Sequence, residues 1–264
     1  MDKLPFAKKS LGQHWLTDQA SLEAMCDAAG VTSKDTVLEI GPGTGTLTEL
    51  LVQRAGQVVA VEFDTRLANE LPGKVKTDNL QVVQQDILGF DFTALPAEYK
   101  VVANIPYYLT SNLIRVLSET PNPPIVVALL VQKEVAERVA AQPGQMSILS
   151  VTAQYYWEVE VGREVPAHLF TPAPKVDSQI LILKRLAKPL FAGVETKQFF
   201  RLVKAGFSQK RKTLTNSLSG GLGISKAEAS ELLQKTGLDP ASRAQTLSLD
   251  EWNSLYERFS REQT

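Results

Sequence analysis

The sequence predicts an α/β fold in which a Rossmann-like domain, with a mostly parallel seven-stranded sheet and an antiparallel edge, precedes a small all-α domain. Five short, continuously apolar runs predict the parallel strands, because strands covered by helices on both faces need apolar side chains along their whole length. Helix-length spacers separate these runs, which lie at 36–40, 58–62, 80–85, 100–105 and 124–131. This alternation is typical of a doubly wound sheet.

Two later runs predict the antiparallel edge. Apolar and acidic residues alternate in 157–165, as in a half-buried strand, and 177–186 supplies a second strand. The segment 166–176 between them contains three prolines. We expect an extended loop without regular pairing there, because proline lacks the N–H that a strand ladder requires.

Helical patterns replace the strand signal after residue 186. Two of them begin with a serine that is followed three residues later by glutamate, which indicates a capping box. These pairs are Ser225 with Glu228 and Ser248 with Glu251. We therefore expect two domains, 1–187 and 188–264. The expected helices of the second domain span 195–207, 210–219, 225–236 and 248–260.

Charge is distributed unevenly over the 264 residues. The net charge is −1, yet residues 1–184 carry 15 basic and 21 acidic side chains, whereas residues 185–264 carry 13 basic and 8 acidic ones. A basic tail can meet a phosphate backbone, although charge alone is equally typical of a solvated helical surface.

Few residues suit metal or disulfide chemistry. The chain has one cysteine, Cys26, and two histidines, His14 and His168, so we expect no disulfide and no metal. No apolar run reaches the roughly 18 residues of a membrane span, and no apolar core of a secretory signal follows the first residues. We therefore expect a cytoplasmic protein without membrane contacts. Nothing in the sequence requires a partner chain, so we expect a monomer.

A glycine-rich turn, GPGTGT, follows the first predicted strand. Glycines let the chain turn sharply and let a ligand approach the backbone where a Cβ would collide, so we expect Gly41 and Gly43 to contact a cofactor. Glu39 precedes the turn, and the G-x-G-x-G spacing differs from the G-x-G-x-x-G that cradles a dinucleotide pyrophosphate. The turn therefore favours a cofactor without phosphates.

Acidic residues end the next two strands. Glu62 can accept hydrogen bonds from both hydroxyls of a ribose, and Asp86 can accept one from an adenine amine, with Ile87 beside the ring. Each acid alone is more typical of a solvated strand end, but their order after successive strands indicates an adenosyl cofactor. The pattern contains no phosphate-binding lysine, so S-adenosyl-L-methionine is favoured over NAD or ATP.

The fourth strand runs into the tetrapeptide Asn104-Ile105-Pro106-Tyr107. The exocyclic amine of adenine is a poor nucleophile because its lone pair is delocalised, so an enzyme that methylates it must accept hydrogen bonds from its N–H groups. The Asn104 side chain can accept one, and the carbonyl of Ile105 or Pro106 another. Tyr107 offers a face for the base. An ordinary structural turn is the plainer interpretation of this tetrapeptide, but its position after the cofactor pattern favours methylation of adenine.

An adenine in folded RNA must be turned out of its stack and held between planar groups. Tyr107 would be one of them, and Phe170 in the proline-rich loop could be the other. A core position is an equally good interpretation of Phe170 on its own.

Several segments resemble the KsgA family, the small-subunit ribosomal RNA adenine N6,N6-dimethyltransferases. The NIPY segment is shared with other amino-methyltransferases, whereas FTPAPKVDS and KRKTLTNSL are far more particular to this family and its relatives. The resemblance covers nearly the whole chain, in segments 8–16, 38–48, 61–64, 84–86, 104–111, 130–139, 166–178 and 207–218.

The resemblance implies dimethylation of two adjacent adenosines in the hairpin loop near the 3′ end of 16S ribosomal RNA, within a small-subunit precursor late in assembly. It also implies that Gly41, Glu62, Asp86 and Asn104 contact the cofactor. Leu16 and the residue at position 14 would close over it. The family usually has asparagine at position 14, where this chain has His14. An imidazole can donate a similar hydrogen bond to the methionine carboxylate and would add a pH dependence.

The basic residues of the tail are expected to dock ribosomal RNA through phosphate contacts that position the substrate. Lys210, Arg211 and Lys212 begin a predicted helix, and Arg201 and Lys204 lie on the preceding one.

Two alternative functions stay open. The first is the related enzyme that methylates one adenine of the large-subunit RNA, although the segments LGQHWL, QKEVAERV and KRKTLTNSL favour the small-subunit enzyme. The second is a non-enzymatic assembly or transcription factor on the same fold. The intact glycine, NIPY and FTPAPKVDS motifs argue against an inactive relative.

Overall fold

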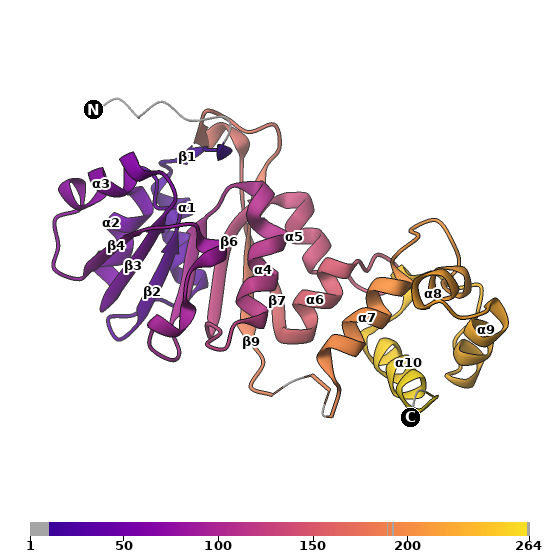
Figure 1. The fold of residues 1–264 in the computed structure, drawn as a ribbon. Helices are drawn as coiled ribbons and strands as arrows, with labels where there is room; N and C mark the ends of the chain where they lie inside the picture. Colours follow the sequence, from indigo (N-terminus) through magenta and orange to yellow (C-terminus); the bar gives the residue numbers. More distant parts are fainter. Residues whose placement is uncertain (1–10, 189, 192, 263–264) are drawn as a thin grey trace. The chain divides into compact units, whose positions relative to one another are not determined.

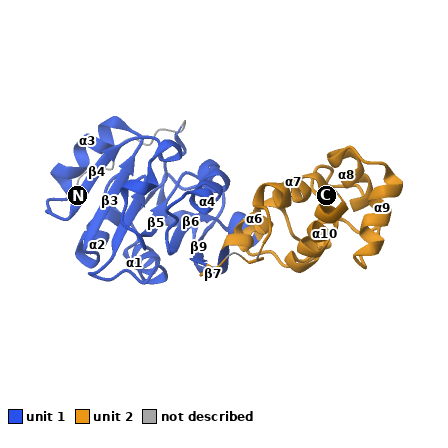
Figure 2. Ribbon diagram, turned by 60° about the horizontal axis from the view of Figure 1, so that its bottom comes forward, with its two compact units in different colours: residues 1–137, 157–185 blue, residues 138–156, 186–264 orange. Residues whose placement is uncertain are grey.

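The computed structural model describes residues 11–188, 190–191 and 193–262, which form two compact units (Figure 2). The first unit contains the residues up to Glu137 together with Trp157–Arg185. The second contains Arg138–Tyr156 and the residues from Leu186 onward. Each unit has an apolar core of its own.

A seven-stranded sheet is the centre of the first unit (Figure 1). In sheet order the strands are β4 (Leu80–Gln84), β3 (Gln57–Glu62), β2 (Thr36–Ile40), β5 (Lys100–Asn104), β6 (Val126–Gln132), β9 (Ser178–Arg185) and β7 (Trp157–Val165). The first five run parallel, β9 pairs antiparallel with β6, and β7 pairs antiparallel with β9 and so runs in the same direction as the first five. The predicted fold class and all seven predicted strands are confirmed.

Helices cover both faces of this sheet. One face carries α1 (Gln19–Ala28), α2 (Thr46–Arg54) and α3 (Thr65–Lys74). Cys26 on α1 is fully buried in this layer. The opposite face carries α4 (Thr110–Glu119), where the Trp157 indole N–H donates to Ser118 Oγ at 2.8 Å. Helix α5 (Lys133–Val139) follows β6.

The strand order reverses between β2 and β5. From β2 the chain continues to β3 and β4 on one side, and β5 and β6 lie on the other. The loops that follow β2 and β5 therefore leave the sheet in opposite directions, and ligands of doubly wound sheets bind in the crevice that results. The glycine turn and the NIPY tetrapeptide follow these two strands, so the topology brings them to one site.

The proline-rich loop differs from its prediction. Phe170–Thr171 forms strand β8, which pairs antiparallel with β1 (Trp15–Leu16). Leu16 is the partner of Phe170, and Trp15 is the partner of Thr171. The expectation of a loop without regular pairing is therefore wrong at these two residues. Neither residue is a proline, so both have the N–H group that strand pairing needs. The prolines lie before and after them, and the pairing is therefore limited to two residues.

The second unit is helical and packs around aromatic side chains that include Phe199 and Trp252, both fully buried. Its helices are α6 (Ile148–Tyr156), α7 (Thr196–Gly206), α8 (Leu214–Leu222), α9 (Lys226–Lys235) and α10 (Leu249–Glu262). Both predicted capping boxes are present, with the serine hydroxyl and the glutamate carboxylate each accepting the other residue's backbone N–H.

Two features of this unit differ from the expectations. The helix expected over 210–219 begins at Leu214, because Thr213 caps it and accepts from the Asn216 N–H through its hydroxyl. In addition, residues 138–156 belong to the helical unit rather than to the first one. The Tyr155 ring on α6 stacks on Phe199 at 5.0 Å between centroids, so the aromatic core decides where this segment packs.

Within the described ranges, no helix is long and apolar enough to cross a membrane. The same residues contain no group of three or more side chains that could hold a metal ion.

Candidate active site

A pocket lies at the carboxyl ends of β2, β3, β4 and β5, and the N-terminal segment 11–16 contributes to its wall. All predicted cofactor contacts line this pocket, namely His14, Leu16, Gly41, Gly43, Glu62, Asp86, Ile87 and Asn104. Among the predicted catalytic residues, Asn104, Pro106 and Tyr107 line it too. Residues 8–10 of the N-terminal motif lie outside the described part of the chain.

The glycine turn has the backbone conformation that its sequence predicts. Gly41 and Gly43 have φ angles of +67° and +58°, in the left-handed region that side chains disfavour. A Cβ on Gly43 would lie 2.6 Å from the Trp15 ring, whereas a Cβ on Gly41 would meet nothing within 4 Å. Gly43 therefore lets the N-terminal segment pack closely on the turn, whereas Gly41 is required for its left-handed conformation and borders open space in the pocket.

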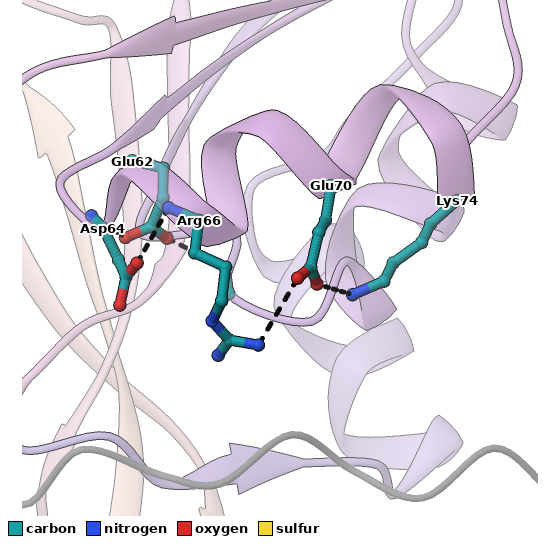
Figure 3. Close-up of polar contacts among 6 residues, drawn as sticks. Glu62, Asp64, Arg66, Glu70 and Lys74 are labelled. Carbon is teal, nitrogen blue, oxygen red and sulfur yellow. Dashed lines mark hydrogen bonds and ion pairs between the residues drawn. The ribbon is translucent and has the colours of Figure 1, made fainter.

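Glu62 fastens this turn to the end of β3 and is 5% exposed. Its Oε2 accepts from the Gly43 N–H at 3.1 Å, and its Oε1 accepts from the Asp64 N–H at 2.8 Å (Figure 3). Burial raises the pKa of Glu62, and these backbone donors oppose the rise. Each carboxylate oxygen has a second acceptor site, so Glu62 can hold the turn and still accept hydroxyl groups of a ligand.

Figure 3 also shows how the chain continues from Glu62 into α3. The Asp64 carboxylate caps this helix by accepting from the Arg66 N–H at 3.0 Å. On the outer surface Glu70 pairs with Arg66 at 3.4 Å and with Lys74 at 3.0 Å. Such exposed pairs contribute little stability, so the cap fixes the start of the helix next to the pocket.

Asp86 lies after β4 rather than on it. Its side chain is exposed and accepts from the Leu88 N–H at 3.0 Å, which caps the short turn 87–89. Ile87 is buried beside it. One carboxylate oxygen of Asp86 thus shapes the turn, and the carboxylate borders the pocket.

Glu39 is the acidic residue that precedes the glycine turn. It is 1% exposed and lines the pocket. Its Oε2 is buried without a hydrogen-bond partner among the described residues. A buried polar atom without a partner costs free energy, so this wall of the pocket suits a ligand that brings a positive charge or a donor.

Asn104 connects the end of β5 to the N-terminal segment. Its Nδ2 donates to the His14 carbonyl at 3.3 Å, and the Thr46 hydroxyl donates to the Leu16 carbonyl at 3.0 Å. Because its amide nitrogen is occupied in this way, Asn104 presents its Oδ1 as the available acceptor.

Tyr107 is held from two sides. Its hydroxyl forms a hydrogen bond of 2.7 Å with the buried Ser178 hydroxyl. The His14 ring stacks on it with 5.9 Å between centroids and an interplanar angle of 19°. His14 Nδ1 in turn contacts the Pro172 carbonyl at 2.6 Å. Burial raises the pKa of Tyr107, so the hydroxyl stays protonated.

Phe170 does not line the pocket. Its side chain is 4% exposed and belongs to the apolar core together with Leu16, Val165 and Ile180. The structure thus brings His14, rather than Phe170, against Tyr107. Ser178 and Trp15 cannot be selected from the sequence alone, because their roles depend on residues far away in the chain. Ser178 does lie within the VDS segment, which is the one signal that points to it.

The five predicted RNA contacts are exposed and lie in two places on the helical unit. Arg201 and Lys204 on α7 line a groove together with Lys197. Lys210, Arg211 and Lys212 lie in the turn before α8, so the expectation that they begin the helix is wrong.

The model of the family described as ribosomal RNA adenine dimethylase matches residues 6–261. The chain belongs to this family. Relatives called ribosomal RNA small subunit methyltransferase A are 42% identical in Dehalococcoides mccartyi and 41% identical in Streptococcus pneumoniae. Each match covers 94% of this chain, and 87% and 90% of the respective relative.

Two solved methyltransferase structures are similar to this one over more than nine-tenths of the chain. A dimethyladenosine transferase from Plasmodium falciparum has a TM-score of 0.81 at 26% identity, covering 95% of this chain and 98% of that one. The 23S rRNA methyltransferase ErmE has a TM-score of 0.75 at 30% identity, covering 93% of this chain and 99% of that one. The fold is therefore shared by a protein named as a dimethyladenosine transferase and by one named as a 23S rRNA methyltransferase.

The chain is accordingly a methyltransferase, and S-adenosyl-L-methionine is the methyl donor of its family. The pocket fits this cofactor, because its glycine turn leaves the backbone open and its wall contains the unpartnered carboxyl of Glu39.

Proposed function

We propose that the protein dimethylates the N6 amines of two adjacent adenosines in the 3′-terminal hairpin loop of 16S ribosomal RNA, within a small-subunit precursor late in assembly. The observation that carries this proposal is the position of Asn104 and Tyr107 in the wall of the pocket, at the end of β5. The family match and the names of the sequence relatives support the choice of RNA.

Cofactor binding is assigned to the residues that line the pocket. Glu62 would accept from the ribose hydroxyls and Asp86 from the adenine amine, while Ile87 packs against the adenine ring. Gly41 and Gly43 would lie under the cofactor, with His14 and Leu16 over it. S-adenosylmethionine supplies a methyl group on a sulfonium, which is a good leaving group.

Asn104 and the backbone next to it would activate the target amine. The Oδ1 of Asn104 accepts one N–H of the amine, since its Nδ2 is engaged by the His14 carbonyl. The Pro106 carbonyl already accepts from the Leu109 N–H at 2.9 Å, which favours the Ile105 carbonyl as the second acceptor. These contacts orient the nitrogen lone pair toward the methyl group, and positioning of this kind requires no strong base.

Tyr107 would support the flipped base from one side. His14 lies against this ring, so the adenine must either displace the imidazole or enter on the other face. Phe170 can serve as the second planar group only if the β1–β8 pairing opens, because its side chain is buried beneath that pairing.

RNA docking is assigned to the helical unit. Arg201 and Lys204 in the α7 groove, and Lys210, Arg211 and Lys212 in the turn before α8, would contact phosphates. Contacts of this kind position the substrate and do not read its sequence. We expect the enzyme to act as a monomer in the cytoplasm, where the ribosomal subunit is assembled.

The test is transfer of labelled methyl groups from S-adenosylmethionine to defined acceptors. Undermethylated 30S particles should be labelled, and mass spectrometry of 3′-terminal 16S fragments should find two dimethylated adenosines. Asn104→Ala should reduce transfer by roughly 100-fold or more, as expected when a positioning contact is lost. Particle binding should persist in this variant.

Two results would contradict the proposal. Labelling confined to naked 23S RNA would assign the chain to the large-subunit reaction, which the similarity to ErmE makes the natural rival. Particle binding without transfer to any small-subunit precursor would assign it to a non-enzymatic assembly role.

A further inference from the structure

Glu39 is a carboxyl group for which the reaction has no evident use. It is the fourth residue of β2, and its side chain is almost completely buried where the strand meets the pocket. The Thr48 hydroxyl on α2 is close enough to lower the pKa of Glu39, against the larger effect of burial. Even so, both Oε2 and this hydroxyl are without a hydrogen-bond partner among the described residues.

No cationic side chain compensates a charge on Glu39. Glu62 faces it from β3 and repels a second negative charge. Cys26 faces it from α1 as a neutral thiol, because burial raises the pKa of this cysteine to about 11. Besides Glu39 and Glu62, the acidic and basic residues on the pocket wall are His14 and Asp86. No lysine or arginine among the described residues lines the pocket.

These surroundings favour the neutral form of the carboxyl group. Burial, with a smaller contribution from Glu62, raises the pKa of Glu39 to about 8. In the ligand-free protein at neutral pH the group therefore carries a proton, as expected for an acid buried without a partner.

The two forms of the cofactor differ in charge. S-adenosylmethionine has a sulfonium, an ammonium and a carboxylate, for a net charge of +1. S-adenosylhomocysteine has a neutral thioether in place of the sulfonium and is uncharged overall. A positive ligand in a pocket lined by acids stabilises an ionised carboxylate, and a neutral ligand does so much less.

We propose that Glu39 releases its proton to solvent when S-adenosylmethionine binds and retains it when S-adenosylhomocysteine binds, so that the pocket discriminates the charged methyl donor from its neutral product. The inference rests on the pocket being the cofactor site. After methyl transfer the positive charge is lost from the sulfur, and Glu39 takes up a proton from solvent. The resulting neutral carboxyl offers no charge attraction to the product.

Proton release can be counted directly by calorimetry. Binding enthalpy is measured at pH 7 in phosphate, HEPES and Tris, whose ionisation enthalpies differ, and the slope gives the number of protons exchanged. For a group of pKa near 8, S-adenosylmethionine should release about 0.9 proton, and S-adenosylhomocysteine should release less than half as many. This comparison uses the wild-type protein alone.

Glu39→Gln identifies the group, because glutamine has the shape of the protonated acid. The number of protons released with S-adenosylmethionine should fall by about 0.9 in this variant. The ratio of wild-type to variant affinity should rise about tenfold from pH 6 to pH 7, since one proton is linked to binding. His14 could exchange a proton of its own, so the same pair is compared in a His14→Asn background, where the difference should persist.

The outcomes separate this inference from the proposed function. Equal proton release with the two ligands, or undiminished release in Glu39→Gln, would overturn the role of Glu39 and leave the methyltransferase assignment intact. Absence of any binding heat with S-adenosylmethionine would overturn both.

Discussion

At the scale of residues, His14 connects three parts of the active site. Its carbonyl accepts from Asn104, its ring stacks on Tyr107, and its Nδ1 contacts the Pro172 carbonyl. A carbonyl oxygen can only accept, so Nδ1 must carry a proton and the other ring nitrogen of the neutral imidazole is an acceptor. Donation to the cofactor's carboxylate, as expected from the sequence, therefore requires the imidazolium form.

Glu39 should also make the stability of the ligand-free protein depend on pH. Its pKa is raised on folding, so the folded state binds more protons than the unfolded state between about pH 4.5 and 8, and stability falls as pH rises through this range. Glu39→Gln removes the effect. The free energy of unfolding of Glu39→Gln, relative to that of the wild type, should rise by about 3–4 kcal/mol from pH 5 to pH 8.

Urea unfolding at several pH values measures this difference. A constant difference between the two proteins across the range would show that Glu39 ionises normally in the folded state.

At the scale of elements, close backbone contact fixes the packing of α7 against α8. A Cβ on Gly221 would lie 2.6 Å from both Cα and Cβ of Ala205. Gly220 is its neighbour on the same helix, yet a Cβ there would meet only the flexible end of Gln209 at 3.3 Å. A side chain can therefore be added at position 220, whereas at position 221 it would collide with the backbone of α7.

Gly221→Ala should destabilise the protein by about 1–3 kcal/mol, because the two helices must separate. Gly220→Ala should stabilise it by about 0.5–1 kcal/mol through helix propensity. Thermal unfolding of the two variants checks this, and shifts of the same sign would contradict the packing argument.

Elements that are specified by local signals could be predicted from the sequence, and those that depend on distant partners could not. The glycine turn and the NIPY tetrapeptide were placed correctly, because each is a local signal at the end of a buried strand and parallel topology aligns those ends. The burial of Phe170 was left open, since it depends on Leu16, and the packing of Tyr155 depends on Phe199. Neither partner is close in sequence. The start of α8 differs from its prediction because the Thr213 side chain caps the helix, which leaves the basic residues before it in a turn.

At the scale of the whole molecule, the excess of acidic residues and the excess of basic residues lie in different parts of the chain. The excess of basic residues lies in 185–264, and within the described structure Lys210, Arg211 and Lys212 form no ion pair. Other cations of the same unit are paired, such as Arg258 with Glu262 at 2.8 Å. Unpaired cations are free to replace counterions on a phosphate backbone.

Replacing Lys210, Arg211 and Lys212 by glutamine should weaken binding to the small-subunit particle and reduce the slope of log K against log salt by about 2 to 3. The matched control replaces Lys235, Arg258 and Arg261, which pair with glutamates on the same unit, and should change the slope much less. Filter-binding measurements at salt concentrations from about 50 to about 300 mM give both slopes. Equal slopes in the two triple variants would contradict the assignment.

The β1–β8 pairing also has a consequence for biosynthesis. Trp15 and Leu16 are made early, but their partners Phe170 and Thr171 are made more than 150 residues later. A nascent chain that has completed β2 to β6 has the glycine turn and Asn104 in place while the cover of the pocket still lacks its anchor. We therefore expect the N-terminal wall of this pocket to close only after the proline-rich segment has left the ribosome, when most of the chain has been made.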